Sequence, residues 1–305
     1  MTTQNKLIMQ KLKWIKPAAV AIGFCAVLTA CDSGSSNTNL PPTQPNVDSL
    51  ELAKMEELQK IFFSIPAPME MASLIKEKGY KYNVAMLNST DNVSKYTGEV
   101  KKAVNLGIYG ADLSYASMFD QKQESIIYLA AAQKLAGQLG VDGALQNDII
   151  ERLNASQDSR DSLMKIVSEA YTDLNGYLKE NNRTEISALV IAGGWLEALH
   201  LTGQYSDKGD AQIKTRIAEQ KLSLDNLIKY FDRFGEKESL KEMKADLVSL
   251  QVLYAEVQST SGKTQATKGS DGTFTIGNSS STSISDETLK KIVTLVGQIR
   301  SKYIA

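Results

Sequence analysis

Histidine and cysteine are nearly absent from this sequence of 305 residues, which holds 1 histidine and 2 cysteines. A di-iron carboxylate site in a helical bundle needs two Glu-x-x-His motifs, so a single histidine excludes it. The low cysteine count also excludes a cysteine-rich zinc site. The sequence has no Walker loop, Gly-x-Gly-x-x-Gly, His-Glu-x-x-His or EF-hand pattern, and we therefore predict no metal and no cofactor.

Proline and aromatic residues are scarce too, at 6 prolines and 7% aromatics, while Ala, Leu, Ile, Lys and Glu dominate the middle of the chain. This composition favours helices over strands. We predict an all-α fold, a multi-helix bundle of about eight to ten helices. Residues 259–285, rich in Gly, Ser and Thr, should form one long loop that is either mobile or folded into a small hairpin at Asp271-Gly272.

The first 30 residues have the three parts of an export signal. They begin with a basic region, continue through the apolar run Pro17 to Leu28, and end in the small-residue stretch Leu28-Thr29-Ala30 before Cys31. The apolar run is too short for a comfortable transmembrane span. We therefore predict a signal peptide at residues 1–30, a flexible Ser-, Asn- and Pro-rich tether at 31–47, and a single helical domain at 48–305.

The ending Leu-Thr-Ala-Cys resembles the lipobox of bacterial lipoproteins, in which the cysteine is diacylated and becomes the first residue of the mature protein. The resemblance implies lipidation of Cys31, and two acyl chains suffice for stable anchoring. Membrane lipid would then be a partner, and the domain would face the periplasm of a Gram-negative envelope. Asp32 resembles the inner-membrane retention signal of enterobacteria. Other groups do not follow that rule, so both membranes remain open.

Charge gives no sign of nucleic-acid binding. The formal net charge of the full chain is −1, and removal of residues 1–30, which carry four lysines and no acid, makes it −5. A mildly acidic protein with lysines scattered among acids has no general attraction to nucleic acid.

The longest apolar stretch of the domain runs from Glu185 to His200. A helix that is apolar on every side must be buried on every side, so we predict that it forms the centre of the bundle. Gly193 and Gly194 would allow the backbone of a neighbouring helix to approach closely. Asn182 and Glu185 are expected to cap its beginning.

Other helices are expected from periodicity and from capping residues. They should end before Gly79, Gly140 and Gly235, and the last should begin after Ser285. The expected ranges are 48–63, 69–78, 92–119, 123–138, 142–153, 156–178, 208–234, 240–257 and the C-terminal stretch from 286.

A faint internal echo suggests two related helical hairpins. Gly110, Leu113 and Ala116 have the spacing of Gly193, Leu196 and Leu199, and each run is followed by a helix that contains Gln-Lys-Leu, at 133–135 and 220–222. Chance similarity is the alternative.

Three stretches, SIPAPMEMASLIKEKG, NLGIYGADLSY and VIAGGWLEAL, resemble a family of uncharacterised predicted lipoproteins of Gram-negative bacteria. The resemblance runs from Ser64 to His200. It implies export and a helical domain, and it transfers no activity and no catalytic residue.

Two places carry residues with chemical potential. Glu197 and His200 are spaced i, i+3 on the central helix, and their simplest interpretation is a partly buried, hydrogen-bonded pair. Asp112 lies between Tyr109 and Tyr115, where a carboxylate has a perturbed pKa or accepts hydrogen bonds from a tyrosine. Together with Trp195, these residues would line a speculative pocket between the two glycine-rich helices.

These observations favour a non-enzymatic, membrane-anchored module that binds or scaffolds an envelope protein. The alternative is a small-molecule-binding or hydrolytic site in that pocket. A deep polar pocket between the glycine-rich helices would favour the alternative, and a filled contact would favour the module.

Overall fold

The computed structural model describes residues 68–141, 149, 151–152, 160–260, 264–268, 274–278 and 281–305. All of these belong to the second of the two units into which the chain divides, Val47–Ala305. The predicted signal, the tether, the helix at 48–63 and most of the helix at 142–153 lie outside the described residues.

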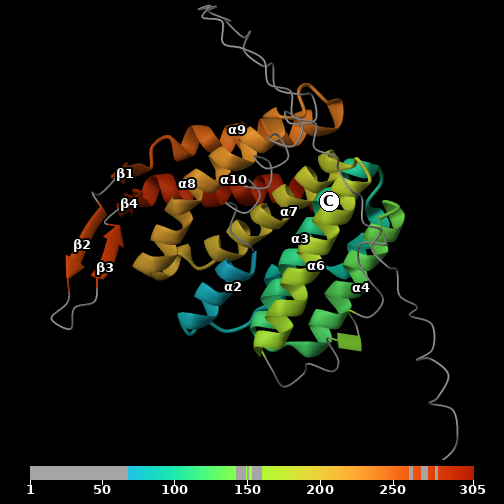
Figure 1. The fold of residues 1–305 in the computed structure, drawn as a ribbon, viewed down its shortest axis with the longest axis horizontal. Coiled ribbons are helices and arrows are strands. Elements are labelled where there is room, and N and C mark those ends of the chain that lie inside the picture. Colours follow the sequence, from blue (N-terminus) through green and yellow to red (C-terminus); the bar gives the residue numbers. More distant parts are fainter. Residues whose placement is uncertain are drawn as a thin grey trace, which may run out of the picture. The chain divides into compact units, whose positions relative to one another are not determined.

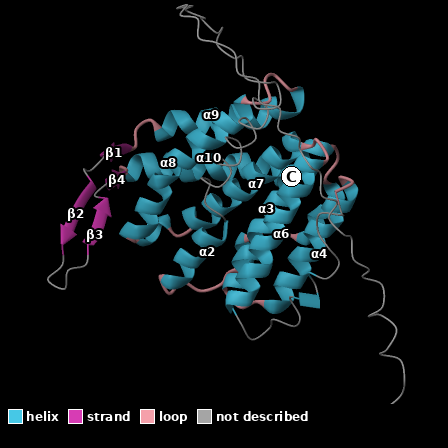
Figure 2. Ribbon diagram, in the orientation of Figure 1, coloured by secondary structure: helices cyan, strands magenta, loops and turns pink. Residues whose placement is uncertain are grey.

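The fold is all-α, as the composition predicted (Figures 1 and 2). Short 3-10 helices lie at Val84–Met86, Thr90–Lys95 and Ser206–Lys208. The described α-helices are α2 (Pro68–Glu77), α3 (Glu99–Met118), α4 (Lys122–Gln138), α6 (Arg160–Glu180), α7 (Thr184–Gly203), α8 (Ala211–Asp232), α9 (Glu238–Tyr254) and α10 (Asp286–Ile304).

Four short strands interrupt the helices near the C-terminus. Strand β1 (Gln258–Thr260) pairs antiparallel with β4 (Ser281–Ser283), and β2 (Thr264–Lys268) pairs antiparallel with β3 (Phe274–Asn278). Lys268 stands opposite Phe274, so β2 and β3 form the arms of a hairpin around the predicted turn, which itself lies outside the described residues. The hairpin projects from the end of the α8–α10 layer in Figure 1.

Helices α3 and α7 cross at the centre of the bundle and share its most extensive helix contact. The sequence prediction of a buried central helix is confirmed for α7, in which nearly every residue from Ile186 to Gly203 is buried. The contact is close because of two glycines. A Cβ atom on Gly107 would lie 1.9 Å from the carbonyl oxygen of Val190, and one on Gly193 would lie 2.0 Å from that of Val104.

The remaining helices cover this central pair from different sides. Helices α4 and α6 pack on α3, and α2 spans α3 and α7. Helices α8, α9 and α10 form a layer against α7, and α10 also reaches α3 (Figure 1). The stripe predicted over 240–257 faces inward in α9, since Leu240, Met243, Leu247, Leu250 and Tyr254 are all buried.

Two predicted boundaries were wrong. The helix expected from residue 92 begins only at Glu99, because the 3-10 turn at Thr90–Lys95 ends in an extended segment and Gly98 has a φ of 79°. Asn182 does not cap α7: its φ is 56°, and the cap position belongs to Arg183, whose side chain makes no capping hydrogen bond. By contrast, Ser285 caps α10 as predicted, accepting a hydrogen bond from the Thr288 N–H at 3.0 Å.

Among the described residues, one stretch is long and apolar enough to cross a membrane, Thr184–Lys208, which contains α7. The fold buries 89% of its most apolar window. The stretch therefore serves as the core helix of this domain.

Candidate functional site

The most unusual feature of the core is a cluster of ionisable side chains from three helices. Asp112 of α3 and Glu197 of α7 are both 0% exposed, and Arg300 of α10 is 8% exposed. The Arg300 guanidinium donates from Nη2 to Glu197 Oε1 at 2.7 Å and from Nε to Glu197 Oε2. This two-pronged contact is the geometry that arginine provides and lysine lacks. The three side chains are called the buried charge cluster below.

The buried charge cluster also fixes the long connection between α2 and α3. Arg300 Nη2 donates to the carbonyl oxygen of Met86 at 3.1 Å, and the backbone N–H of Asn88 donates to Asp112 Oδ2 at 3.2 Å. The irregular segment thus contacts a cation on one side and a carboxyl group on the other. Polar backbone groups that burial would otherwise leave unpaired find their partners here.

Asp112 and Glu197 lie in the same buried site, where two ionised carboxylates would repel each other. Burial raises the pKa of Asp112 well above its ordinary value, and Glu197 raises it further, while Arg300 and the Asn88 N–H act in the opposite direction. A raised pKa favours the protonated form of the Asp112 carboxyl, whose Oδ1 has no hydrogen-bond partner among the described residues. The Arg300 guanidinium then pairs with Glu197 alone.

His200 lies one turn beyond Glu197 on α7 and does not form the hydrogen-bonded pair predicted from the sequence. Both oxygens of Glu197 accept from Arg300, and His200 Nδ1 has no hydrogen-bond partner among the described residues. Burial lowers the pKa of His200 to about 4, an effect that Arg300 strengthens and Glu197 opposes. The imidazole is therefore neutral at pH 7.

A polar network surrounds the cluster and ties the connection to α3. The Asn88 side-chain amide donates to Tyr96 OH at 2.8 Å and to Asn105 Oδ1 at 3.2 Å. Asn105 in turn donates to the Tyr303 carbonyl at 2.9 Å, and Tyr109 donates to the Ser89 carbonyl at 2.8 Å. These bonds satisfy buried polar groups of α3 and hold the end of α10 against it.

The other two residues of the predicted pocket point elsewhere. Trp195 donates from Nε1 to Gln220 Oε1 of α8 at 3.1 Å. Tyr115 shares a hydrogen bond with the Tyr205 hydroxyl at 2.9 Å. The structure therefore brings together Asp112 and Glu197, with Tyr109 and His200 nearby, and it separates Trp195 and Tyr115 from them.

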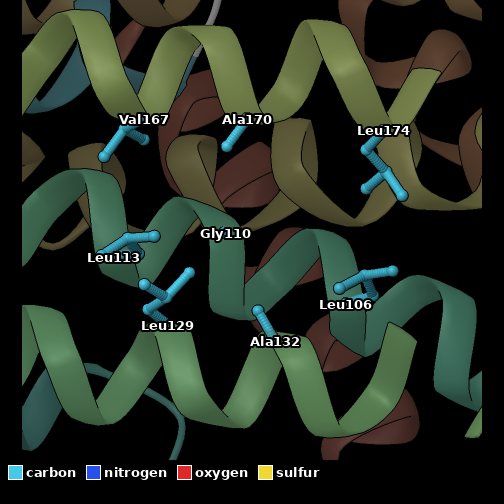
Figure 3. A pocket seen from close by; sticks show the side chains of 8 residues that line it. All are labelled: Leu106, Gly110, Leu113, Leu129, Ala132, Val167, Ala170 and Leu174. Atoms are coloured by element: carbon cyan, nitrogen blue, oxygen red, sulfur yellow. The ribbon is translucent and has the colours of Figure 1, made fainter. Parts of the chain in front are cut away.

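At the point where the two glycine-rich helices cross, backbone contact takes the place of the predicted pocket. Their backbones touch at Gly107 and Gly193, which leaves no room for a ligand between them at the crossing. A hollow of about 30 Å³ lies instead beside α3, between α4 and α6 (Figure 3). Its lining is wholly apolar, consisting of Leu106, Gly110, Leu113, Leu129, Ala132, Val167, Ala170 and Leu174.

Sequence reasoning missed Arg300, Asn88 and Asn105. One sequence pattern could have revealed Arg300, because this residue lies in the apolar stripe of α10 between Val296 and Tyr303. A basic residue in such a stripe is buried only with a partner. In the part of the chain that the structure describes, no three His, Cys, Asp or Glu side chains gather in a way that could hold a metal ion.

Comparisons of this chain with protein families, with curated proteins and with solved structures find no match. The functional argument therefore rests on the residues themselves. In the described core, the ionisable side chains of the buried charge cluster come from α3, α7 and α10 and face one another.

Proposed function

We propose that this chain is a lipoprotein of the Gram-negative envelope, anchored through acylated Cys31, whose helical domain binds or scaffolds an envelope protein without catalysing a reaction. The observation that carries the proposal is the order of a basic start, a short apolar run and Leu-Thr-Ala-Cys at residues 28–31. The resemblance of the Ser64–His200 stretch to a family of predicted Gram-negative lipoproteins agrees with this proposal.

The fold supports this proposal in two ways. The one described stretch apolar enough to enter a membrane is buried as the core helix and is not free to insert, which is compatible with a lipid anchor at Cys31. The buried charge cluster is enclosed, with Asp112 and Glu197 fully buried, and its contacts join α3, α7 and α10 to one another. The cluster therefore contributes to the stability of the domain, and the outer surface of the domain is left to contact a partner.

The anchor is tested by changing Cys31 to Ser in the full chain and expressing it in a Gram-negative host with radiolabelled palmitate. The wild type should fractionate with membranes and carry the label, while Cys31→Ser should carry none. Cys25→Ser is the matched control, because Cys25 lies inside the predicted signal peptide, and it should behave like the wild type. An unlabelled wild type would contradict the anchor.

The binding role needs a separate measurement. Cross-linking in intact cells, followed by purification of the lipidated chain, should recover an envelope protein in an amount comparable to the chain itself. Cys31→Ser should recover less of it, because anchoring raises the local concentration of both proteins. If only lipid is recovered with the wild type, the scaffolding role is wrong. The palmitate label on the wild type then decides separately whether the anchor is present.

A further inference from the structure

The connection between α6 and α7 contains an asparagine in the sequence pattern of a glycan acceptor. Residues 180–184 read Glu-Asn-Asn-Arg-Thr, so Asn182 begins an Asn-x-Ser/Thr pattern, which marks N-linked glycosylation in exported proteins. Bacterial oligosaccharyltransferases also read an acidic residue two positions before the asparagine. Glu180, the last residue of α6, occupies that position, and Thr184 is the first residue of α7. Residues 180–184 are called the acceptor turn.

The Asn-x-Ser/Thr pattern alone does not single out this site. Four other copies begin at Asn88, Asn92, Asn154 and Asn278, and none has an acid two positions earlier. The side chain of Asn88 is buried in the polar network described above, and Asn92 Nδ2 donates to Asn88 Oδ1 at 2.9 Å. The copies at 154 and 278 lie wholly or partly outside the described residues. The acidic residue therefore occurs only in the acceptor turn.

The acceptor turn leaves its three recognition residues available. Glu180 and Asn182 are exposed and Thr184 is half-buried, and none of their side chains has a hydrogen-bond or ion-pair partner in the described part of the chain. The intervening Arg183 instead pairs with Glu99 of α3. The position that the pattern leaves unspecified thus holds the turn against the bundle, and the three specified positions remain free.

The backbone alone gives a reason for an asparagine at position 182. Its φ of 56° is left-handed, and the next N–H, that of Arg183, donates to the Leu178 carbonyl at 2.8 Å. Helices commonly end in this way with glycine or asparagine at the left-handed residue. This requirement explains neither the acid at 180 nor the hydroxyl at 184, and glycine would meet it equally well. Asn182→Gly therefore removes the acceptor amide and keeps the turn.

We propose that Asn182 is a site of N-linked glycosylation in the periplasm, an inference that rests on the export in the proposed function. Asn182 Nδ2 attacks C1 of the first sugar of an oligosaccharide carried on a lipid pyrophosphate. The bond from C1 to the pyrophosphate oxygen breaks, the lipid pyrophosphate leaves with the electron pair, and the amide loses one proton as the N–C bond forms. The glycan is bulky and solubilising, so a partner protein would bind away from the acceptor turn.

Glycan transfer with purified components tests the site without requiring export. The full chain, purified from a host without the enzyme, is incubated with a bacterial oligosaccharyltransferase and its lipid-linked oligosaccharide, and chymotryptic peptides are analysed by mass spectrometry. The wild type should gain one glycan on the peptide that contains Asn182. Asn182→Gly should gain none while its urea midpoint is not lowered, and Glu180→Gln should lose most of the transfer. Asn181→Gln is the matched control, because it changes a neighbouring exposed asparagine at an unspecified position, and it should be modified like the wild type.

Three outcomes would overturn the proposal. The first is an unmodified wild type in a reaction that modifies a control peptide with the same pattern. The second is a glycan that persists on the corresponding peptide of Asn182→Gly. The third is transfer to the isolated chymotryptic peptide but not to the intact chain, which would show that the folded turn is closed to the enzyme. None of these results depends on the signal peptide, so they are separate from the palmitate label that tests the anchor.

Discussion

Gly107 and Gly193 make reciprocal contacts: each faces the carbonyl oxygen of a valine that precedes the other glycine by one turn. Gly107 meets Val190, and Gly193 meets Val104. The contact therefore relates Gly107 to Gly193, whereas the sequence echo had matched Gly110 with Gly193. In the contact register, Glu99 and Leu113 of α3 correspond to Glu185 and Leu199 of α7.

The first prediction concerns this crossing. Gly193→Ala places a methyl group against backbone rather than a flexible side chain, so α3 and α7 must move apart, at a cost of about 1–3 kcal/mol of unfolding free energy. Gly297→Ala in α10 is the control, because nothing lies within 4 Å of its added Cβ. It should stabilise by up to about 1 kcal/mol through helix propensity. Urea denaturation measures both, and stabilisation by Gly193→Ala would contradict the close crossing.

The second prediction concerns Arg300. Arg300→Met leaves Glu197 charged and buried without its cation, a change that typically costs about 3–5 kcal/mol. Arg300→Lys should also destabilise, because an ammonium cannot make both contacts to the carboxylate. Lys291→Met in the same helix breaks only a solvent-exposed pair with Glu287 and should change the unfolding free energy little.

A double variant separates charge from packing at the same position. Glu197→Gln combined with Arg300→Met removes both charges, and it should be more stable than Arg300→Met alone. Equal stability of the single and double variants would mean that Arg300 contributes packing rather than neutralisation.

The third prediction concerns the proton on the Asp112 carboxyl. The folded protein holds this proton above pH 4, where an unfolded aspartate releases it, so the Asp112 contribution to stability decreases as the pH rises. Asp112→Asn has nearly the same shape as the protonated acid and does not titrate. Its unfolding free energy, minus that of the wild type, should increase from about pH 4 upward. Glu287→Gln, whose carboxyl has a pKa lowered by Lys291, should give a small difference of opposite sign.

The fourth prediction uses the only histidine in the chain. His200 stays neutral in the fold until the pH falls to about 4, whereas the unfolded imidazole gains a proton near pH 6.5. Stability associated with His200 is therefore complete above pH 6.5 and decreases as the pH falls towards 4. The imidazole proton resonances should titrate with a pKa of about 4 in the folded protein and near 6.5 in urea. A folded value near 6.5 would contradict its burial.

Helix α7 could be predicted because almost all of its residues are apolar, as a helix buried on every side requires. Nearly every residue from Ile186 to Gly203 is buried, and the sequence shows this directly as an apolar run. Helix α3 is buried as thoroughly, yet it contains Asn105, Asp112 and Ser114, which give it a mixed composition. Ser114 donates to the Gly110 carbonyl within α3, but Asn105 and Asp112 have partners in the connection before α3 and in α10, and no local pattern links such distant residues.

The Glu197–His200 interpretation failed for a related reason. A spacing of i, i+3 places two side chains on the same face of a helix, but it does not determine which neighbour each one contacts. Arg300 approaches that face from the other end of the chain and takes both oxygens of Glu197. A guanidinium outcompetes a neutral imidazole for a buried carboxylate because it adds charge to the hydrogen bonds.

The position of Arg300 in α10 affects the order in which the core of the domain can form during synthesis. During synthesis, Asp112 and Glu197 emerge long before the arginine that neutralises their shared site. A nascent chain that stops before α10 cannot bury Glu197 without leaving an unpaired charge, so α3 and α7 should dock fully only after α10 has emerged. A product truncated before Arg300 should therefore remain open and be cut more readily by proteases than the chain that contains α10.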